Sequence, residues 1–161
     1  MKRIGIFFIL LLCVVFSACE PEEDTLSKCF GFEKSDFIIS EETDTHGGFL
    51  GDGSYYLILD CSQNADKARD IVKNWTALPL RGNLQLVMYG GARNGMIYGY
   101  NFAEEAHWST IENGVYKFVD RHSESKDSSD YSEILDRFSF NFSIAVYDFD
   151  SDILYYFETD T

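Results

Sequence analysis

The sequence predicts an α+β fold, an antiparallel and mostly meandering β-sheet with one main helix packed on a face. Aromatic residues make up 16% of the chain, and most of them lie in short alternating runs that suit strands. A single stretch, residues 62–75, places its apolar residues at helical spacing instead. Residues 34–161 are therefore expected to form one α+β domain.

The strand-like runs are short and are separated by glycine-rich or acidic connections. The pair Asn94-Gly95 predicts a hairpin turn between two of these runs, and Asn113-Gly114 is a second pair of this type. In the clearest run, Phe138, Phe140, Phe142, Ile144 and Val146 alternate with small or polar residues, which predicts a half-buried strand. Strands are expected at 36–42, 54–61, 84–89, 96–102, 115–120, 138–147 and 153–158.

One convincing helix is expected at 62–75. Ser62 or Asn64 is suited to cap its start, and Pro79 and Gly82 follow its end. A Ser/Asp-rich loop, residues 120–133, is expected to end in one helical turn at 131–136. The helical face of 62–75 is formed by Ala65, Ala68, Ile71, Val72 and Trp75.

The N-terminus has the pattern of a secretion signal. Lys2 and Arg3 precede an uncharged, largely apolar run, residues 4–18. A membrane-spanning helix needs about 20 such residues, whereas the apolar part of a signal peptide has roughly 7–15. The run ends in small residues before Cys19. Residues 1–18 are therefore expected to be removed as a signal peptide.

The stretch "FSAC", residues 16–19, resembles the lipobox of bacterial lipoproteins, although Phe16 stands where leucine is usual. The resemblance implies that a peptidase cuts before Cys19, whose sulfur then carries a diacylglycerol. The residues also fit an ordinary secretory signal that is cut after Ala18 and leaves Cys19 free. Residues 19–33 are acidic and polar, and they are expected to form a tether between the membrane and the domain.

The charge balance excludes a nucleic-acid partner. The chain has 27 acidic and 13 basic residues, and removal of Lys2 and Arg3 leaves a formal charge of −16. Phosphate binding needs a basic face, which such a chain does not offer. Anionic headgroups would repel the domain, so a lipid on Cys19 is expected to hold it at the extracytoplasmic face of the cell membrane.

The segment "DTHGGFLGDG", residues 44–53, is the most suggestive loop. It lacks the lysine and the following helix of a phosphate-binding loop, and its glycines are in the reverse order of the dinucleotide fingerprint. "HGG" is similar to an esterase oxyanion loop, but the chain has no G-x-S-x-G pentapeptide. We expect an exposed connection at a sheet rim, with His46, Asp52 and His122 as candidates for contact with a ligand or partner.

The spacing of the histidine and aspartate residues does not indicate a metal site. His46, His107 and His122 form no H-x-x-x-H pair. "DFDSD", residues 148–152, is spaced like the start of a calcium loop, but isoleucine and threonine occupy the positions of the required glycine and glutamate. No metal site, cofactor or catalytic residue is expected.

Two cysteines of the predicted domain and tether leave two alternatives open. Outside the cytoplasm, Cys29 and Cys61 are able to form a disulfide. Cys61 also continues the apolar alternation of Tyr55, Leu57 and Leu59, which favours a buried free thiol.

The segments "DTHGGFLGDGSYYLILDCS", "LPLRGNLQLVMYGG" and "DRHSESKDSSD" resemble uncharacterised small lipoproteins of Gram-positive bacteria. This resemblance implies a location at the cell membrane and no particular activity. Two functions are therefore considered. The first is a non-enzymatic module that binds a protein, a cell-wall component or a small molecule. The alternative is a small hydrolase or metal-dependent enzyme that uses His46 with Asp44 and Asp52.

Overall fold

The computed structural model describes residues 24–47, 52–108 and 110–161, and it has the expected α+β fold. All neighbouring strands of the main sheet are antiparallel, and their order is β1-β2-β8-β7-β6-β3. Strands β6, β7 and β8 follow one another as a meander, and β1 and β2 form a hairpin. Strand β8 lies between β7 and β2, which joins the two parts into one sheet. The strands are β1 (Ile38–Asp44), β2 (Gly53–Asp60), β3 (Thr76–Ala77), β6 (Gly114–Asp120), β7 (Asn141–Asp148) and β8 (Ile153–Asp160).

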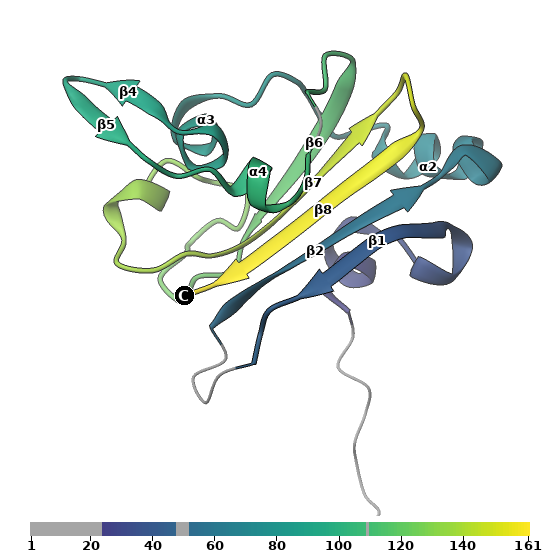
Figure 1. The fold of residues 1–161 in the computed structure, drawn as a ribbon, viewed down its shortest axis with the longest axis horizontal. Helices are drawn as coiled ribbons and strands as arrows, with labels where there is room; N and C mark the ends of the chain where they lie inside the picture. Colours follow the sequence, from purple (N-terminus) through teal and green to yellow (C-terminus); the bar gives the residue numbers. More distant parts are fainter. Residues whose placement is uncertain (1–23, 48–51, 109) are drawn as a thin grey trace, which may run out of the picture.

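Helical segments cover both faces of this sheet (Figure 1). One face carries η1 (Leu26–Phe30), η2 (Lys34–Asp36), η3 (Ser62–Asn64) and α2 (Ala65–Val72). The main helix of the prediction is the continuous pair η3 and α2. The other face carries α3 (Gly82–Tyr89), α4 (Phe102–Glu105), η4 (Ile134–Asp136) and the separate hairpin of β4 (Gly91–Arg93) and β5 (Met96–Tyr98).

Strand β7 separates two hydrophobic cores. Phe142, Ile144 and Val146 belong to the core beneath α3 and α4, whereas Ala145 and Tyr147 belong to the core beneath α2. The predicted inward face is confirmed at these three positions, but the other face is buried as well because helices cover both sides of the sheet. Phe138, expected in the same strand, precedes β7 and is fully exposed.

The predicted strand at 84–89 is wrong, because these residues form most of α3. Leu84, Val87 and Met88 are buried at helical spacing, and the exposed residues Gln85 and Tyr89 lie one turn apart. The turn at Asn94-Gly95 is confirmed by φ values of 53° and 79°. It joins β4 to β5, so only the first half of the predicted strand 96–102 is extended.

The packed domain begins before residue 34, where the sequence placed its boundary. Leu26, Phe30 and Phe32 are almost completely buried. The ring of Phe30 lies 6.0 Å from Trp75 and 5.4 Å from Tyr156, in edge-to-face contacts. The C-terminal part of the predicted tether is therefore part of the core beneath α2.

Candidate functional site

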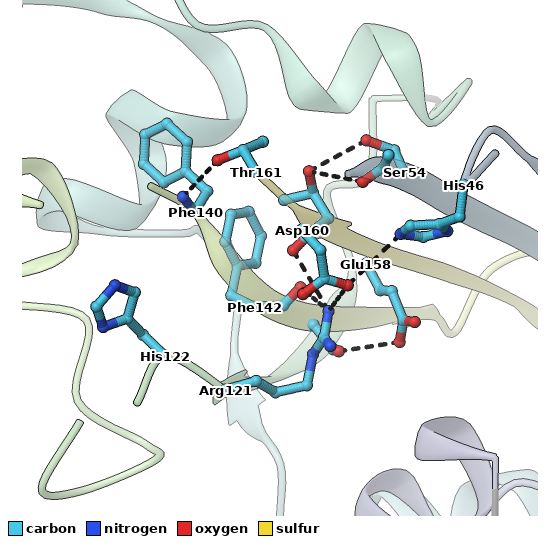
Figure 2. Close-up of polar contacts among 12 residues, drawn as sticks. His46, Ser54, Arg121, His122, Phe140, Phe142, Glu158, Asp160 and Thr161 are labelled. Atoms are coloured by element: carbon cyan, nitrogen blue, oxygen red, sulfur yellow. Dashed lines mark hydrogen bonds and ion pairs between the residues drawn. The ribbon is translucent and has the colours of Figure 1, made fainter. Parts of the chain in front are cut away.

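One end of the sheet carries His46, Asp52 and His122, the candidates of the sequence, but no side-chain contact joins them within the described residues. The register pairs Gly53 and Asn141 with Asp160, so the start of β2, the start of β7 and the end of β8 meet there. His46 lies in the connection between β1 and β2, and His122 follows β6 (Figure 2). We call the cluster of His46, Arg121 and Asp160 the sheet rim.

His46 is held between two carboxylates of the sheet rim. Its Nδ1 lies 2.7 Å from Asp44 Oδ1, and its backbone N–H donates to the same oxygen at 2.9 Å. These two hydrogen bonds hold the pKa of the Asp44 carboxyl below its usual value, and the backbone hydrogen bond has the larger effect. Nε2 lies 3.5 Å from Asp160 Oδ2 and is buried without a hydrogen-bond partner. Both ring nitrogens therefore face carboxylates of the protein itself.

Arg121 ties three strand ends together (Figure 2). Its Nη2 donates to Asp160 Oδ2 at 2.9 Å, and to the backbone oxygens of Phe142 and Thr159 at 3.3 Å each. The charge of Arg121 is thus paired inside the rim. Asp160 is shared between Arg121 and His46, which links the β1–β2 connection to β8.

The ring of His122 is also engaged within the protein. Its Nε2 lies 3.2 Å from Ser139 Oγ, and its Nδ1 accepts the backbone N–H of Glu124 at 3.2 Å. Its backbone N–H donates to Asp120, which accepts a 2.6 Å hydrogen bond from Arg137. The side chains of this Asp120–Arg137 pair are only 2% and 11% exposed. No local pattern in the sequence indicated this pair.

The other candidates do not assemble into a metal site. Asp52 is exposed, and His107 pairs with Glu41 at 2.7 Å. Asp152, which resembled a calcium ligand, accepts hydrogen bonds from Tyr147 and Arg69 at 2.7 Å and 2.8 Å. Across the described residues, no group of three His, Cys, Asp or Glu side chains is arranged to hold a metal ion.

The two cysteines of the described chain are free thiols. Cys61 is completely buried in the core beneath α2, and this burial raises the pKa of its thiol to about 12. Cys29 is partly buried against the same core. Cys19, the predicted lipidation site, lies outside the described residues. None of the described helices is long and apolar enough to cross a membrane.

A groove that the sequence did not indicate crosses the edge of the sheet beside β6. It consists of two adjoining hollows of about 570 Å³ each, which share Ser129 and Tyr131. The first lies between the segment after α2 and strand β6, and the second lies between the Ser/Asp-rich loop and the start of α3. We call it the β6 groove; its lining includes Asn74, Trp75, Thr76, Lys117, Ser129, Asp130 and Tyr131.

The aromatic walls of the β6 groove are fixed from behind. Trp75 packs at 6.0 Å against Phe30 and at 5.9 Å against Phe32. Tyr131 packs edge-to-face on Phe118 at 5.6 Å. Its hydroxyl lies 3.3 Å from that of Tyr116, whose pKa is raised to about 12, first by burial and then by this hydrogen bond. The two walls thus present rings in set orientations.

A second cleft, of about 470 Å³, lies beside α3. It is mainly apolar and is lined by Leu78, Pro79, Tyr89 and Trp108, among others. The indole Nε1 of Trp108 is buried without a hydrogen-bond partner. Each of the two tryptophans of the chain therefore lines a different hollow.

Comparison of the chain with family models, with curated proteins and with solved structures finds no match. The fold and the two sites define an α+β domain with a polar rim of mutually contacting side chains and an open aromatic groove.

Proposed function

We propose that the protein is a lipid-anchored, non-enzymatic binding module on the extracytoplasmic face of the cell membrane. The anchor is supported by the positive N-terminus, the short apolar run and the small residues before Cys19. The packed domain begins a few residues after Cys19, because Leu26 is already buried. The domain would therefore sit close to the bilayer surface.

The observation that carries the binding function is the β6 groove. Ligand sites are usually preformed hollows of roughly 300–1,000 Å³, lined by aromatic side chains and a few polar groups. Each half of the β6 groove has about 570 Å³, and its rings are held by internal contacts.

The alternative, a hydrolase or metal-dependent enzyme built on His46, has less support. The Asp44–His46 contact is the orienting half of an acid–base pair. The other ring nitrogen, however, is buried and faces Asp160 rather than a nucleophile. Asp52, the third residue of this alternative, makes no hydrogen bond within the described residues.

The anchor is tested by Cys19→Ala. We expect this variant to remain as uncut precursor or to leave the membrane fraction, whereas the wild-type chain partitions into detergent. Ser17→Thr, which keeps the cysteine, serves as the control. Unchanged processing of Cys19→Ala together with unchanged detergent partitioning would refute the anchor.

Binding is tested with the processed, detergent-solubilised protein and with a double variant, Asn74→Ala plus Thr76→Ala. Both side chains are exposed in the β6 groove, and neither makes a hydrogen bond within the described residues. We expect protease-treated wall material or envelope protein to co-sediment with wild type and much less with this variant. Gln63→Ala, which is also exposed and lies on η3 outside the groove, is the matched control. Equal retention by all three proteins would remove the groove as the binding surface.

A further inference from the structure

We infer that the β6 groove binds an uncharged oligosaccharide, an inference that rests on the binding function proposed above. A pyranose ring has an apolar face of C–H groups and a rim of hydroxyl groups. A site for it therefore needs flat aromatic surfaces next to hydrogen-bonding side chains, without an excess of charge of one sign. The β6 groove combines these three features.

The aromatic surfaces are Trp75 and Tyr131, both half-buried. Trp75 is backed by Phe30 and Phe32, and Tyr131 is backed by Phe118 and held through its hydroxyl. Because these contacts already fix the rings, little conformational freedom is lost when a sugar stacks on them.

The hydrogen-bonding groups lie beside these rings. Asn74 and Thr76, on either side of Trp75 in the chain, are exposed and make no side-chain hydrogen bond within the described residues. An amide and a hydroxyl each donate and accept, as sugar hydroxyls do. They are therefore free to replace the water that a sugar loses on binding.

The lining of the groove carries no net charge, because its two charged side chains, Lys117 and Asp130, are opposite in sign and are both hydrogen-bonded within the protein. Lys117 donates to the backbone oxygen of Cys29 at 2.5 Å, and its ammonium lies over the ring of Phe30. Asp130 accepts the backbone N–H and the hydroxyl of Ser132 at 2.8 Å and 3.0 Å. Lys117 and Asp130 are the only charged side chains among the described lining residues. The groove thus suits a neutral ligand rather than an ionic one.

The chief rival is a peptide that adds a strand to the edge of β6. Strand β3 pairs only through Thr76 with Tyr116 and Ala77 with Val115. Farther along β6, the backbone N–H of Asp120 donates to Ser128 at 2.7 Å. The edge between these contacts is residues 117–119, too short for the row of backbone hydrogen bonds that strand addition uses. The double hollow instead suits several linked sugar units.

The experiment uses the tryptophans as separate reporters, because Trp75 lines the β6 groove and Trp108 lines the cleft beside α3. Processed full-length protein is titrated with neutral tetrasaccharides of N-acetylglucosamine, of β-1,4-glucose, of α-1,4-glucose and of mannose. With Trp108→Phe, we expect at least one of them to change the emission of Trp75 saturably. With Trp75→Phe, the emission of Trp108 should stay constant.

The double variant Asn74→Ala plus Thr76→Ala, made in the Trp108→Phe protein, should lower the affinity for that sugar about tenfold. Adding Gln63→Ala instead should leave its affinity unchanged. Absence of saturable binding for all four sugars, or a signal from Trp108 alone, overturns the inference. If envelope material is still retained through Asn74 and Thr76 in that case, the binding module stands and its ligand is a protein or a charged polymer. If retention fails too, both proposals fall.

Discussion

The sheet rim and the β6 groove lie at different borders of one sheet and differ in how their polar groups are used. At the rim, Arg121 is paired with Asp160 and donates to backbone oxygens, and His46 is hydrogen-bonded to Asp44 with its other ring nitrogen 3.5 Å from Asp160. In the groove, Asn74 and Thr76 have no side-chain partner among the described residues. Histidine and aspartate drew attention to the rim in the sequence, yet its unpartnered atoms, His46 Nε2, Arg121 Nε and Asn141 Oδ1, are buried, whereas the exposed side chains with free hydrogen-bonding capacity lie in the groove.

The difference shows why residue type alone is a weak guide to a site. A charged group that is partly removed from water must be paired, and the rim residues pair with one another across strand ends. A ligand would have to break such pairs. Exposed amides and hydroxyls beside rigid rings carry no such constraint, so they are available for recognition.

The largest effect is expected where the polar end of the sheet is most buried. Arg137→Ala leaves the Asp120 carboxylate, 2% exposed, without its partner. Loss of one partner of a buried pair costs about 3–5 kcal/mol of unfolding free energy. Chemical denaturation measures the loss.

The control for this prediction is Arg69→Ala, which breaks the more exposed contact with Asp152 and should cost much less unfolding free energy. Equal losses for the two variants would show that the Asp120–Arg137 pair is not buried as described.

The next effect concerns the close approach of Gly53 to the connection that carries His46. A Cβ at residue 53 would lie 2.6 Å from the backbone nitrogen of His46, closer than real contacts allow. Gly53→Ala should therefore cost about 1–3 kcal/mol through overpacking. Thermal unfolding monitored by circular dichroism gives the shift. Gly99→Ala, with open space around it, should change little, and a similar shift for both would contradict the packing at His46.

How much of this was visible in the sequence depends on the range of the interactions. Local patterns located the turn at Asn94-Gly95, the helix that begins at Ser62 and the alternation of β7. The segment 84–89 failed because Leu84, Leu86 and Met88 alternate as in a strand, while Leu84, Val87 and Met88 also match a helix. In the structure, glycines with positive φ stand at both ends of α3, Gly82 as its first residue and Gly90 directly after it.

The parts that could not be predicted are contacts between distant segments. Arg121 and Asp160 are 39 residues apart, and Trp75 contacts Phe30, from which β1 and β2 separate it along the chain. The acidic composition before residue 26 also concealed Leu26 and Phe30, whose burial depends on the finished core. The rim location of His46 and His122 was predictable. The residues that each histidine contacts, and the existence of the β6 groove, were not.

A smaller effect on stability is expected at the rim, where the contribution of Asp44 depends on pH. The folded pKa of Asp44 is lower than its ordinary value of 3.8, so the folded chain binds fewer protons there than the unfolded chain. Its stabilisation is complete above pH 3.8 and is lost as the pH falls through the folded pKa. Asp44 is largely exposed, so Asp44→Asn should cost less than about 1 kcal/mol at pH 7.

Unfolding midpoints between pH 2 and pH 7 test this expectation. The difference between wild type and Asp44→Asn should vanish toward pH 2. Asp52→Asn, an exposed change in the same connection, is the matched control. A difference that persists at pH 2 would show that the carboxylate of Asp44 does not stabilise this end of the sheet.

The smallest effect on stability is expected in the groove, and it completes the contrast with the rim. Asn74→Ala plus Thr76→Ala removes exposed side chains that have no partner among the described residues, so the free energy of unfolding should change by no more than about 0.5 kcal/mol per substitution. The same double variant should nevertheless lose retention of envelope material. Denaturation and co-sedimentation of one preparation measure both quantities. A large loss of stability would mean that these side chains hold the fold together, and the groove would then be no more open to a ligand than the rim.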